Sequence, residues 1–491
     1  MTVEDTQDPG GTDHRDLRRG AALNLLGNLF KLADPILLVA VAARYGTERF
    51  GLFYVAQAVT LLLLRVSLLG MDKALLWWVP QEKHRSPLPL LRRAAGWGLG
   101  ASMTLVMLVM VFVGPEFMAA QGRPPEAALV LRLLVLSLPI LVGIELLTHA
   151  TMGTRSMRTN VIVKDMIAPV AFPGFALAFA ATGRLEVGLS IAFLGSNLIA
   201  LGAAAVGFHR CFRGRPKGTS SPPGIRRYAM PMWGAEISNS LLQRLDVLLI
   251  EALTGNFGLA GVWGIVTKLS NSLRAIRRSF DPIVAAIAAE PAVSPQRLAG
   301  VLSRASFLVS SLQVPVVVFL FVFAGEVLSL FGEGFELATT PLLILSAGWL
   351  VVSAVGLSGV ALYARGHAVL HLLNVLLTIA ALLAVGTVLI PRLDLVGAAI
   401  AVVAAYLFQA GLQALQLRRL AGVWGLDRVS AMPLVAGLVG LAFAAVSALA
   451  TDLPLSTTPR RVVGYVSFAA AYGASLWALQ RTRAHAAQAS G

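Results

Sequence analysis

The chain has 491 residues, of which 57% are hydrophobic and 13% charged, and its mean hydropathy is +0.75. Soluble domains carry roughly 25% charged residues, so this composition excludes a water-soluble protein and indicates a chain that resides in a bilayer. A net charge of +15 would suggest nucleic-acid binding in a soluble protein. Here the basic residues stand between apolar runs, as they do in the loops of membrane proteins, so we expect no nucleic-acid partner.

Apolar runs long enough to cross a bilayer follow one another along the chain. Residues 1–20 are polar and lack the pattern of a cleavable signal peptide, so we expect a cytoplasmic N-terminal tail. A spanning helix needs about 20 apolar residues, and the sequence predicts about fourteen such spans. They lie at 21–43, 52–71, 94–115, 128–150, 161–182, 187–208, 229–253, 260–286, 305–325, 339–362, 369–390, 395–416, 432–451 and 462–480. This pattern predicts an all-α polytopic membrane protein.

The loops between these runs alternate in charge. The most basic loop contains Arg210, Arg213, Arg215, Lys217, Arg226 and Arg227. The loop that holds Glu326, Glu333 and Glu336 contains no Lys or Arg. Because basic loops stay on the cytoplasmic side, we expect both termini in the cytoplasm.

The motifs argue against an enzyme. The loops are short, which leaves no external domain of the kind that a membrane glycosyltransferase or polymerase uses to hold its acceptor. The first predicted outside loop has no Asp-x-Asp pair, and we find no P-loop, nucleophile elbow or His/Cys metal cluster. The single cysteine, Cys211, excludes an intramolecular disulfide. We therefore expect a transporter with no cofactor and no metal.

A short repeat divides the chain. Phe50-Gly51-Leu52 joins the first two predicted spans, and Phe257-Gly258-Leu259 joins the seventh and eighth. This spacing predicts two six-helix lobes related by a pseudo-twofold axis along the membrane normal. The predicted order is an N-lobe at 21–210, a basic cytoplasmic linker at 211–228, a C-lobe at 229–417, a terminal helix pair at 418–480 and a cytoplasmic tail at 481–491.

A set of ordered segments resembles a known family. They read ARYGTERFGL at 43–52, LGMDKA at 69–74, YAMP at 228–231, LQRLD at 242–246, VLSLFGEGF at 327–335, IP at 390–391 and VGAAIA at 396–401. Their order and spacing over residues 20–420 resemble the polysaccharide flippase branch of the multidrug/oligosaccharidyl-lipid/polysaccharide exporter superfamily.

The resemblance implies a function and a location. Such proteins move undecaprenyl-pyrophosphate-linked oligosaccharide to the periplasmic side of the bacterial inner membrane, for O-antigen, capsule or exopolysaccharide assembly. It also implies alternating access between two lobes, driven by an ion gradient. Membrane lipids, a polysaccharide polymerase and chain-length machinery are the partners that it suggests. Since both lobes lie in one chain, we expect a monomer, and the role of the last two helices stays open.

Basic residues inside the predicted spans suit an anionic cargo. A buried ionisable group costs at least about 2.5–3.5 kcal/mol, so it persists where it faces a cavity or a partner. Arg65 and Arg274 each lie about four turns past a Phe-Gly-Leu joint, which predicts a similar depth. The expected pyrophosphate and sugar contacts are Lys31, Arg65, Arg244, Lys268, Arg274 and Arg277. Pairing with nearby acids, or snorkelling to headgroups, is the alternative role for several of them.

Ion coupling requires a titratable or cation-binding group. The candidates are Asp34, Glu145 and Asp246. Glu145 and His149 are spaced i,i+4 and could share a proton, or form a structural pair. The sequence leaves the coupling ion open between H⁺ and Na⁺.

Two other transporters compete with this interpretation. A lipid II flippase also needs a cationic cavity, so charge does not separate it from an oligosaccharide flippase. A multidrug cation antiporter needs an acidic or aromatic cavity, and the excess of buried basic residues argues against it.

Overall fold

The computed structural model describes a helical chain. Its backbone is described for residues 9–82, 85–154, 156–220, 224–290, 293–355, 357–425, 428–449 and 458–489. Side chains are described over the same ranges except 9–34, 226, 286, 368, 428, 444–449, 458–460 and 482–489. Within these ranges, all regular structure is helical apart from one isolated bridge between Ser86 and Lys217.

The described chain forms two compact units. The first extends to Gly264 and includes Phe331–Glu333, and the second comprises Ile265–Leu330 and the residues from Gly334 onward. The first unit contains α1 (Pro9–Leu68), α2 (Met71–Trp78), η1 (Val79–Glu82), α3 (Leu88–Phe112), α4 (Pro115–Ala120), α5 (Glu126–Val135), α6 (Leu138–Met152), α7 (Arg158–Asn160), the π-helical η2 (Val161–Ile167), α8 (Ala168–Ala181), α9 (Leu185–Phe212), α10 (Ile225–Leu242), α11 (Leu245–Thr254) and the start of α12 (Phe257–Arg278).

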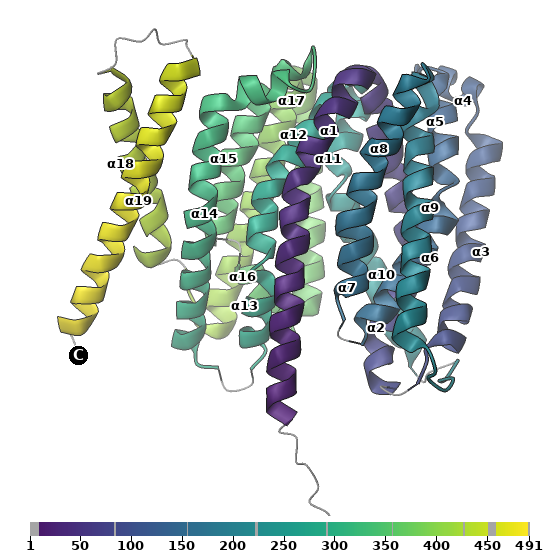
Figure 1. Ribbon diagram of the computed structural model, residues 1–491, viewed down its shortest axis with the longest axis horizontal. Helices are drawn as coiled ribbons and strands as arrows, with labels where there is room; N and C mark the ends of the chain where they lie inside the picture. Colours follow the sequence, from purple (N-terminus) through teal and green to yellow (C-terminus); the bar gives the residue numbers. More distant parts are fainter. Residues whose placement is uncertain are drawn as a thin grey trace, which may run out of the picture. The chain divides into compact units, whose positions relative to one another are not determined.

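The helices of the first unit run alongside one another (Figure 1). Helix α6 packs on α3 and α9, and α8 packs on α9 and α1. Helix α1 turns sharply at Gly46, whose φ of 75° lies in the left-handed region that favours glycine. This turn folds the first two predicted spans back on each other.

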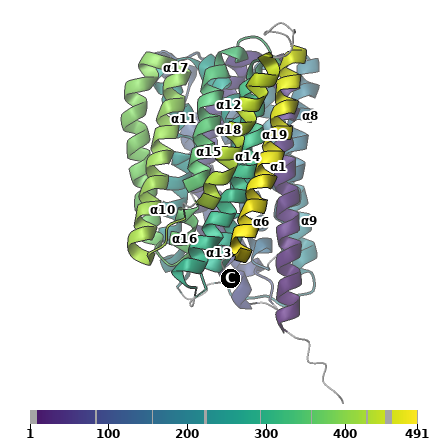
Figure 2. The ribbon, with the colours of Figure 1, turned by 90° about the vertical axis from the view of Figure 1, so that its left-hand side faces the viewer.

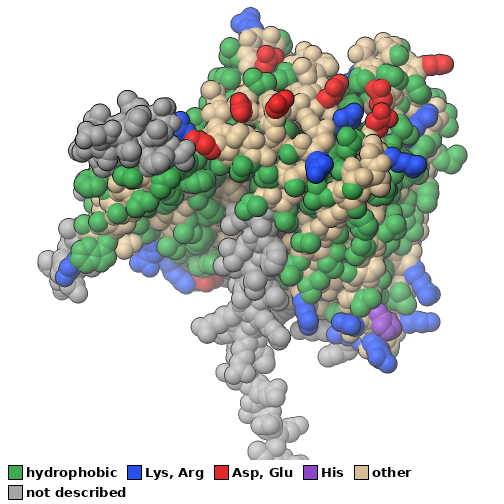
Figure 3. Space-filling model, turned by 45° about the horizontal axis from the view of Figure 1, so that its top comes forward, with side chains coloured by type: hydrophobic (Ala, Val, Ile, Leu, Met, Phe, Trp, Pro, Cys, Tyr) green, Lys and Arg blue, Asp and Glu red, His purple; other side chains and the backbone are tan. Residues whose placement is uncertain are grey.

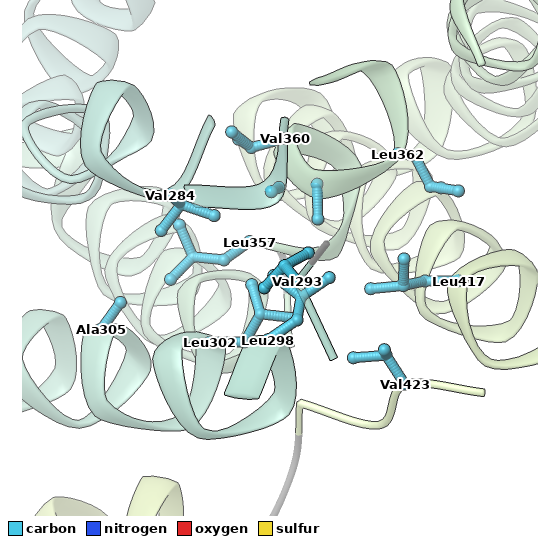
Figure 4. Packing of buried hydrophobic residues seen from close by; sticks show 12 residues of the cluster. Val284, Val293, Leu298, Leu302, Ala305, Leu357, Val360, Leu362, Leu417 and Val423 are labelled. Atoms are coloured by element: carbon cyan, nitrogen blue, oxygen red, sulfur yellow. The ribbon is translucent and has the colours of Figure 1, made fainter. Parts of the chain in front are cut away.

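The second unit contains the rest of α12 and the later helices. These are α13 (Asp281–Ala288), α14 (Pro295–Ser329), η3 (Phe335–Ala338), α15 (Thr339–Val355), α16 (Ser358–Ala364), α17 (Ala368–Ala421), α18 (Arg428–Leu449) and α19 (Thr458–Ala489). One buried cluster joins Val284, Leu298 and Leu357 from α13, α14 and the turn before α16 (Figure 4). The C-terminal pair α18 and α19 packs on α14 (Figure 2), and Phe468 and Val314 belong to a second buried cluster there.

Nine helices among the described residues are long and apolar enough to cross a membrane. Their flanks expose large hydrophobic side chains, such as Val111 at 68% and Val466 at 60%. Hydrophobic side chains cover much of the helix flanks visible in Figure 3. Water would penalise this exposure, whereas lipid tails favour it, so the surface suits a multi-pass membrane protein.

Each of the predicted spans lies on helical backbone as far as it is described, but several are broken. The span predicted at 128–150 divides into α5 and α6, and that at 260–286 divides into α12 and α13. In both cases a proline stands in the first turn of the second helix, because it cannot continue the first one. Span 229–253 divides at Gln243–Arg244 instead. The count of about fourteen membrane spans and the cytoplasmic placement of both termini stay predictions.

The two Phe-Gly-Leu joints pack against each other within the first unit. A Cβ added at Gly51 would lie 1.7 Å from the Phe257 carbonyl oxygen, and one at Gly261 would lie 2.0 Å from the Thr47 oxygen. This backbone contact holds the start of α12 on α1. The compact unit therefore ends at Gly264, inside the predicted C-lobe (229–417), rather than at the predicted linker (211–228). The assignment of lobes stays a prediction.

The predicted basic linker is tied to the loop after α2. Ser86 N–H donates to the Pro216 oxygen (2.7 Å) and Gly218 N–H donates to the Ser86 oxygen (2.9 Å). The Glu82 carboxylate accepts from the Thr219 hydroxyl (2.6 Å) and the Thr219 N–H (3.1 Å). Burial alone would raise the pKa of Glu82, but these hydrogen bonds and the charge of Arg85 outweigh it and lower that pKa.

We expect Gly51→Ala to destabilise the protein, because the new methyl would overlap the Phe257 carbonyl. Overpacking of this kind costs about 1–3 kcal/mol. Gly96→Ala is the matched control, since nothing lies within 4 Å of a Cβ there. Thermal unfolding in detergent should give a lower midpoint for Gly51→Ala and an unchanged or higher one for Gly96→Ala. Equal midpoints would contradict the close contact.

Glu82→Gln tests the tie to the linker through its pH dependence. A carboxyl group with a lowered folded-state pKa stabilises the fold above its unfolded pKa and loses that effect as pH falls through the folded value. The loss in thermal midpoint caused by Glu82→Gln should be full at pH 7 and should shrink below about pH 4.3, the ordinary glutamate value. Exposed Glu48→Gln serves as the control. A loss that does not change with pH would show that the Glu82 charge has no role.

Candidate functional site

A buried ionic cluster occupies the first unit. We call it the Glu145 cluster; it consists of Arg65, Asp72, Glu145, His149 and Lys164. Arg65 lies near the end of α1, Asp72 in α2, Glu145 and His149 on α6, and Lys164 in η2. The cluster thus joins four helical segments from two separate stretches of the chain, α1–α2 and α6–η2.

Glu145 is the centre of the cluster. Its carboxylate accepts a hydrogen bond from Lys164 Nζ (2.8 Å) and lies 3.7 Å from Arg65 Nη2. His149 Nδ1 lies 3.3 Å from the same carboxylate, so the predicted i,i+4 pair is in contact. Glu145 therefore faces three groups that can carry positive charge.

The geometry of His149 leaves one ring nitrogen to exchange a proton. Nδ1 lies 2.8 Å from the Glu145 backbone oxygen, which only accepts, so Nδ1 carries a hydrogen. Nε2 lies 3.8 Å from Asp72 Oδ2, which is buried and without a hydrogen-bond partner in the described structure. A proton taken up on Nε2 would therefore face an unsatisfied carboxylate oxygen.

Burial divides the cluster into an inner and an outer part. The side chains of Asp72, His149 and Glu145 are 2%, 8% and 11% exposed, whereas those of Arg65 and Lys164 are 23% and 28% exposed. The acids are thus enclosed, and the two cations reach toward open space. An enclosed carboxylate is stable only with such partners.

Asp72, Glu145 and His149 could in principle hold a metal ion, since one ligand atom from each lies within 4.8 Å of the others. The charges argue against this use. Lys164 Nζ already lies 2.8 Å from Glu145, and Arg65 Nη1 lies 3.6 Å from Asp72. Two fixed cations at these distances would repel a third, so the arrangement suits a proton better.

Arg65 keeps its hydrogen-bonding capacity. Its two carboxylate contacts, at 3.6 and 3.7 Å, are longer than a hydrogen bond. No described hydrogen bond is donated by its guanidinium; the Arg65 backbone oxygen accepts from Trp233 Nε1 (3.1 Å). The side chain is held near the acids by charge, while its N–H groups stay available to a ligand.

Arg244 lies close enough to Arg65 to repel it electrostatically. It caps α11 at the break after α10, and its Nη1 donates to the Ser240 oxygen (3.1 Å) and hydroxyl (2.9 Å). Lys73 and Glu236 form a further link between α2 and α10 (3.1 Å). The structure thus brings together two of the predicted cargo contacts, Arg65 and Arg244.

Asp246, a predicted coupling group, has structural partners. Its Oδ2 accepts from Trp263 Nε1 (3.0 Å) and its Oδ1 from the Val247 N–H (2.8 Å). The bond to Trp263 links α11 to α12, and the bond to Val247 lies within the first turn of α11. Lys31 and Asp34, the remaining predicted groups of the first unit, lie outside the residues whose side chains are described.

The second unit holds three predicted cargo contacts on α12. The Arg274 guanidinium lies over the rings of Trp349 (4.5 Å) and Tyr406 (5.1 Å). Lys268 and Arg277 are half-buried. Arg277 interacts electrostatically with Asp281, so part of its charge is matched within the unit.

A second buried ion pair lies elsewhere in the first unit. Arg123 forms two contacts with Glu251, from Nε to Oε1 (2.7 Å) and from Nη2 to Oε2 (2.8 Å). The Glu251 side chain is 5% exposed. A cavity of about 240 Å³ beside the pair is lined by apolar residues including Phe257. This bidentate pair ties the loop before α5 to α11.

Sequence reasoning missed Asp72, Lys164 and Arg123. Lys164 was detectable, because it interrupts the predicted span 161–182 with a charge. Asp72 falls one residue beyond the predicted span 52–71, and Arg123 lies in a loop. Neither residue therefore places a charge inside an apolar run, where it would be noticed. Their partners lie on other helices, which periodicity does not reveal.

Comparisons with known proteins agree with this architecture. Residues 17–295 match the family model described as polysaccharide biosynthesis protein. A search of curated proteins finds no significant match. Among solved structures, the chain is similar to the lipid II flippase MurJ in an inward closed conformation, with a TM-score of 0.75 and 11% identity over 94% of this chain and 99% of that one.

Two further structures share the fold. A MATE family multidrug resistance transporter of the MOP superfamily, in an inward-facing conformation, aligns with a TM-score of 0.60 and 17% identity, over 82% of this chain and 98% of that one. A MOP superfamily transporter from Pyrococcus furiosus aligns with a TM-score of 0.56 and 16% identity, over 85% and 95%. At these identities the likeness shows the fold alone. It confirms the predicted all-α, multi-pass architecture, and the family-model match over residues 17–295 confirms the predicted polysaccharide family.

A double-mutant cycle tests the ion pair at the centre of the Glu145 cluster. We expect Glu145→Gln and Lys164→Met to interact by roughly 1–3 kcal/mol in the free energy of unfolding, because each leaves the other group without its partner. The control is the Arg297–Glu290 pair, which has the same 2.8 Å distance but is exposed and should interact by less than about 1 kcal/mol. Denaturant titration in micelles measures both cycles. Strictly additive effects at Glu145 and Lys164 would refute the pairing.

Proposed function

The chain belongs to the polysaccharide biosynthesis protein family, and from this we propose that it is a flippase for an anionic, lipid-linked sugar. Its cargo is an undecaprenyl-pyrophosphate-linked oligosaccharide, a repeat unit of O-antigen, capsule or exopolysaccharide. It moves this cargo from the cytoplasmic to the periplasmic leaflet of the bacterial inner membrane. Its structural neighbours are a flippase and transporters, and they support this class of function.

The observation that carries the proposal is the state of Arg65. A guanidinium presents a planar fork of donors that matches phosphate oxygens. Arg65 is 23% exposed, uses none of these donors in a described hydrogen bond, and has Arg244 nearby. Two guanidinium groups within electrostatic range of each other would attract a pyrophosphate and would repel a cationic drug. This charge favours a lipid-linked sugar over a multidrug antiporter.

Binding of cargo at Arg65 is coupled to the Glu145 cluster. A phosphate that draws the guanidinium away removes positive charge from Asp72 and Glu145. The Glu145 and Asp72 carboxylates, which lie 3.3 Å from Nδ1 and 3.8 Å from Nε2 of His149, then favour a proton on this ring. Since linkage is reciprocal, protonation of His149 releases Arg65 to the cargo. In this scheme protons are the coupling ion, and cargo affinity rises as pH falls.

A lipid II flippase is the second candidate, because the similarity to MurJ extends over 94% of this chain. Both cargoes carry a pyrophosphate, so the Arg65 and Arg244 site serves either one. The difference lies in the sugar. Competition between the two lipids therefore separates the candidates.

We expect Arg65→Ala to reduce delivery of a fluorescent undecaprenyl-pyrophosphate oligosaccharide to the outer leaflet of proteoliposomes by at least about tenfold, the value of one charge-assisted hydrogen bond. Arg65→Lys keeps the charge but loses the fork, and should recover only part of the activity. Arg184→Ala, at an exposed position before α9, is the matched control. His149→Gln should retain binding but remove its dependence on pH.

Three outcomes of this experiment would change the assignment of the site or of the cargo. Normal delivery by Arg65→Ala would reject the anion site and keep the flippase. Absence of delivery by the unaltered protein, under a proton gradient of either sign, would reject the oligosaccharide flippase. Unlabelled lipid II that competes more strongly than the oligosaccharide lipid would favour the second candidate.

A further inference from the structure

A cavity separate from the Glu145 cluster opens between α7, η2 and α9. Its volume is about 460 Å³. One part of its wall is polar and basic, and carries Arg158, Arg210, Ser156 and Thr159. The other part is apolar and includes Ile162 and Val206. The cavity therefore has a basic part and an apolar part.

The cavity lies at the edge of the apolar spans. Arg158 begins the candidate span Arg158–Ala181, and Arg210 lies near the end of the candidate span Leu185–Phe212. Both arginines thus stand at the level where lipid headgroups meet the hydrocarbon. Val206, one turn further into the span, is 50% exposed, so the apolar wall opens toward the hydrocarbon.

Both arginines are available to an anion. Their side chains are exposed, and neither takes part in any of the ion pairs found among the described residues. Two such guanidinium groups beside Ser and Thr hydroxyls form a donor set for phosphate oxygens. Basic pockets between transmembrane helices at the cytoplasmic side are a known type of site for anionic lipid headgroups.

We propose that this cavity binds an anionic glycerophospholipid. The phosphate lies between Arg158 and Arg210, and an acyl chain follows the apolar wall past Ile162 and Val206. The site is distinct from Arg65 and does not depend on the proposed function. It does adjoin the Glu145 cluster, because η2 presents Ile162 to the cavity and places Lys164 on Glu145. A bound lipid therefore supports the segment that positions Lys164.

The single cysteine of the chain makes the proposal measurable. Cys211 lines the cavity, is half-buried and carries a free thiol. The full-length protein in micelles is treated with a neutral maleimide, and the alkylation rate is followed as phosphatidylglycerol is added. We expect this lipid to slow the reaction of Cys211 and phosphatidylcholine not to do so. In the Arg158→Ala/Arg210→Ala variant, the concentration needed for protection should rise by about fivefold per arginine.

Matched controls separate a charge-selective lipid site from a nonspecific one. Arg184→Ala removes an exposed arginine at the other end of α9. In this variant, phosphatidylglycerol should protect Cys211 as it does in the unaltered chain. Inorganic phosphate at the same concentration should not protect, because it cannot occupy the apolar wall. Native mass spectrometry supplies a second readout that is independent of thiol reactivity. It should show a retained phosphatidylglycerol that the double variant loses, with the thermal midpoint unchanged.

Four results would overturn the proposal. Equal protection by phosphatidylcholine would show a groove without charge selectivity. Equal protection by phosphate would show a site for a free anion. Stronger competition by undecaprenyl pyrophosphate would assign the cavity to the cargo route. Retention of the lipid by Arg158→Ala/Arg210→Ala would exclude these arginines as its ligands.

Discussion

A bilayer tolerates a polypeptide only where every backbone N–H and C=O finds a partner inside the protein, and this constraint shapes the whole molecule. It explains why the described regular structure is helical and why helix breaks are confined to particular places. Two of the breaks also carry groups of the candidate site. The break between α10 and α11 presents Arg244, and the junction after α1 brings Asp72 onto α6. Irregular backbone, which is costly in lipid, is thus concentrated beside enclosed polar groups.

The Glu145 cluster has its acids on the inside and its cations toward the outside. A structural ion-pair network has no need of such a gradient in exposure. In a binding site it is useful, because an outer cation can turn away from a carboxylate toward an incoming phosphate. The carboxylates then require a substitute charge, and His149 is the nearest group able to supply one. A single set of contacts can therefore link an anionic lipid to a proton.

Sequence reasoning succeeded where a property is local. The spans were predictable because apolar length determines them, and the Glu145–His149 contact was predictable because i,i+4 neighbours share a helix face. It failed where partners come from different helices. Arg65 looked isolated in an apolar run, yet it meets Asp72 and Glu145. Likewise, nothing in the linker 211–228 signals that Gly51 and Gly261 hold the start of α12 on α1.

The pair of Arg123 and Glu251 has a consequence for any motion that would separate the loop before α5 from α11. The Glu251 side chain is 5% exposed and that of Arg123 is 30% exposed, so one ion is enclosed and the other meets solvent. Coulomb attraction falls as the dielectric constant rises, from an effective value of about 20 near a protein surface to about 80 in water. Separation of the two ions would admit water to Glu251 and weaken their attraction further. Such a motion would therefore proceed cooperatively rather than in small independent steps.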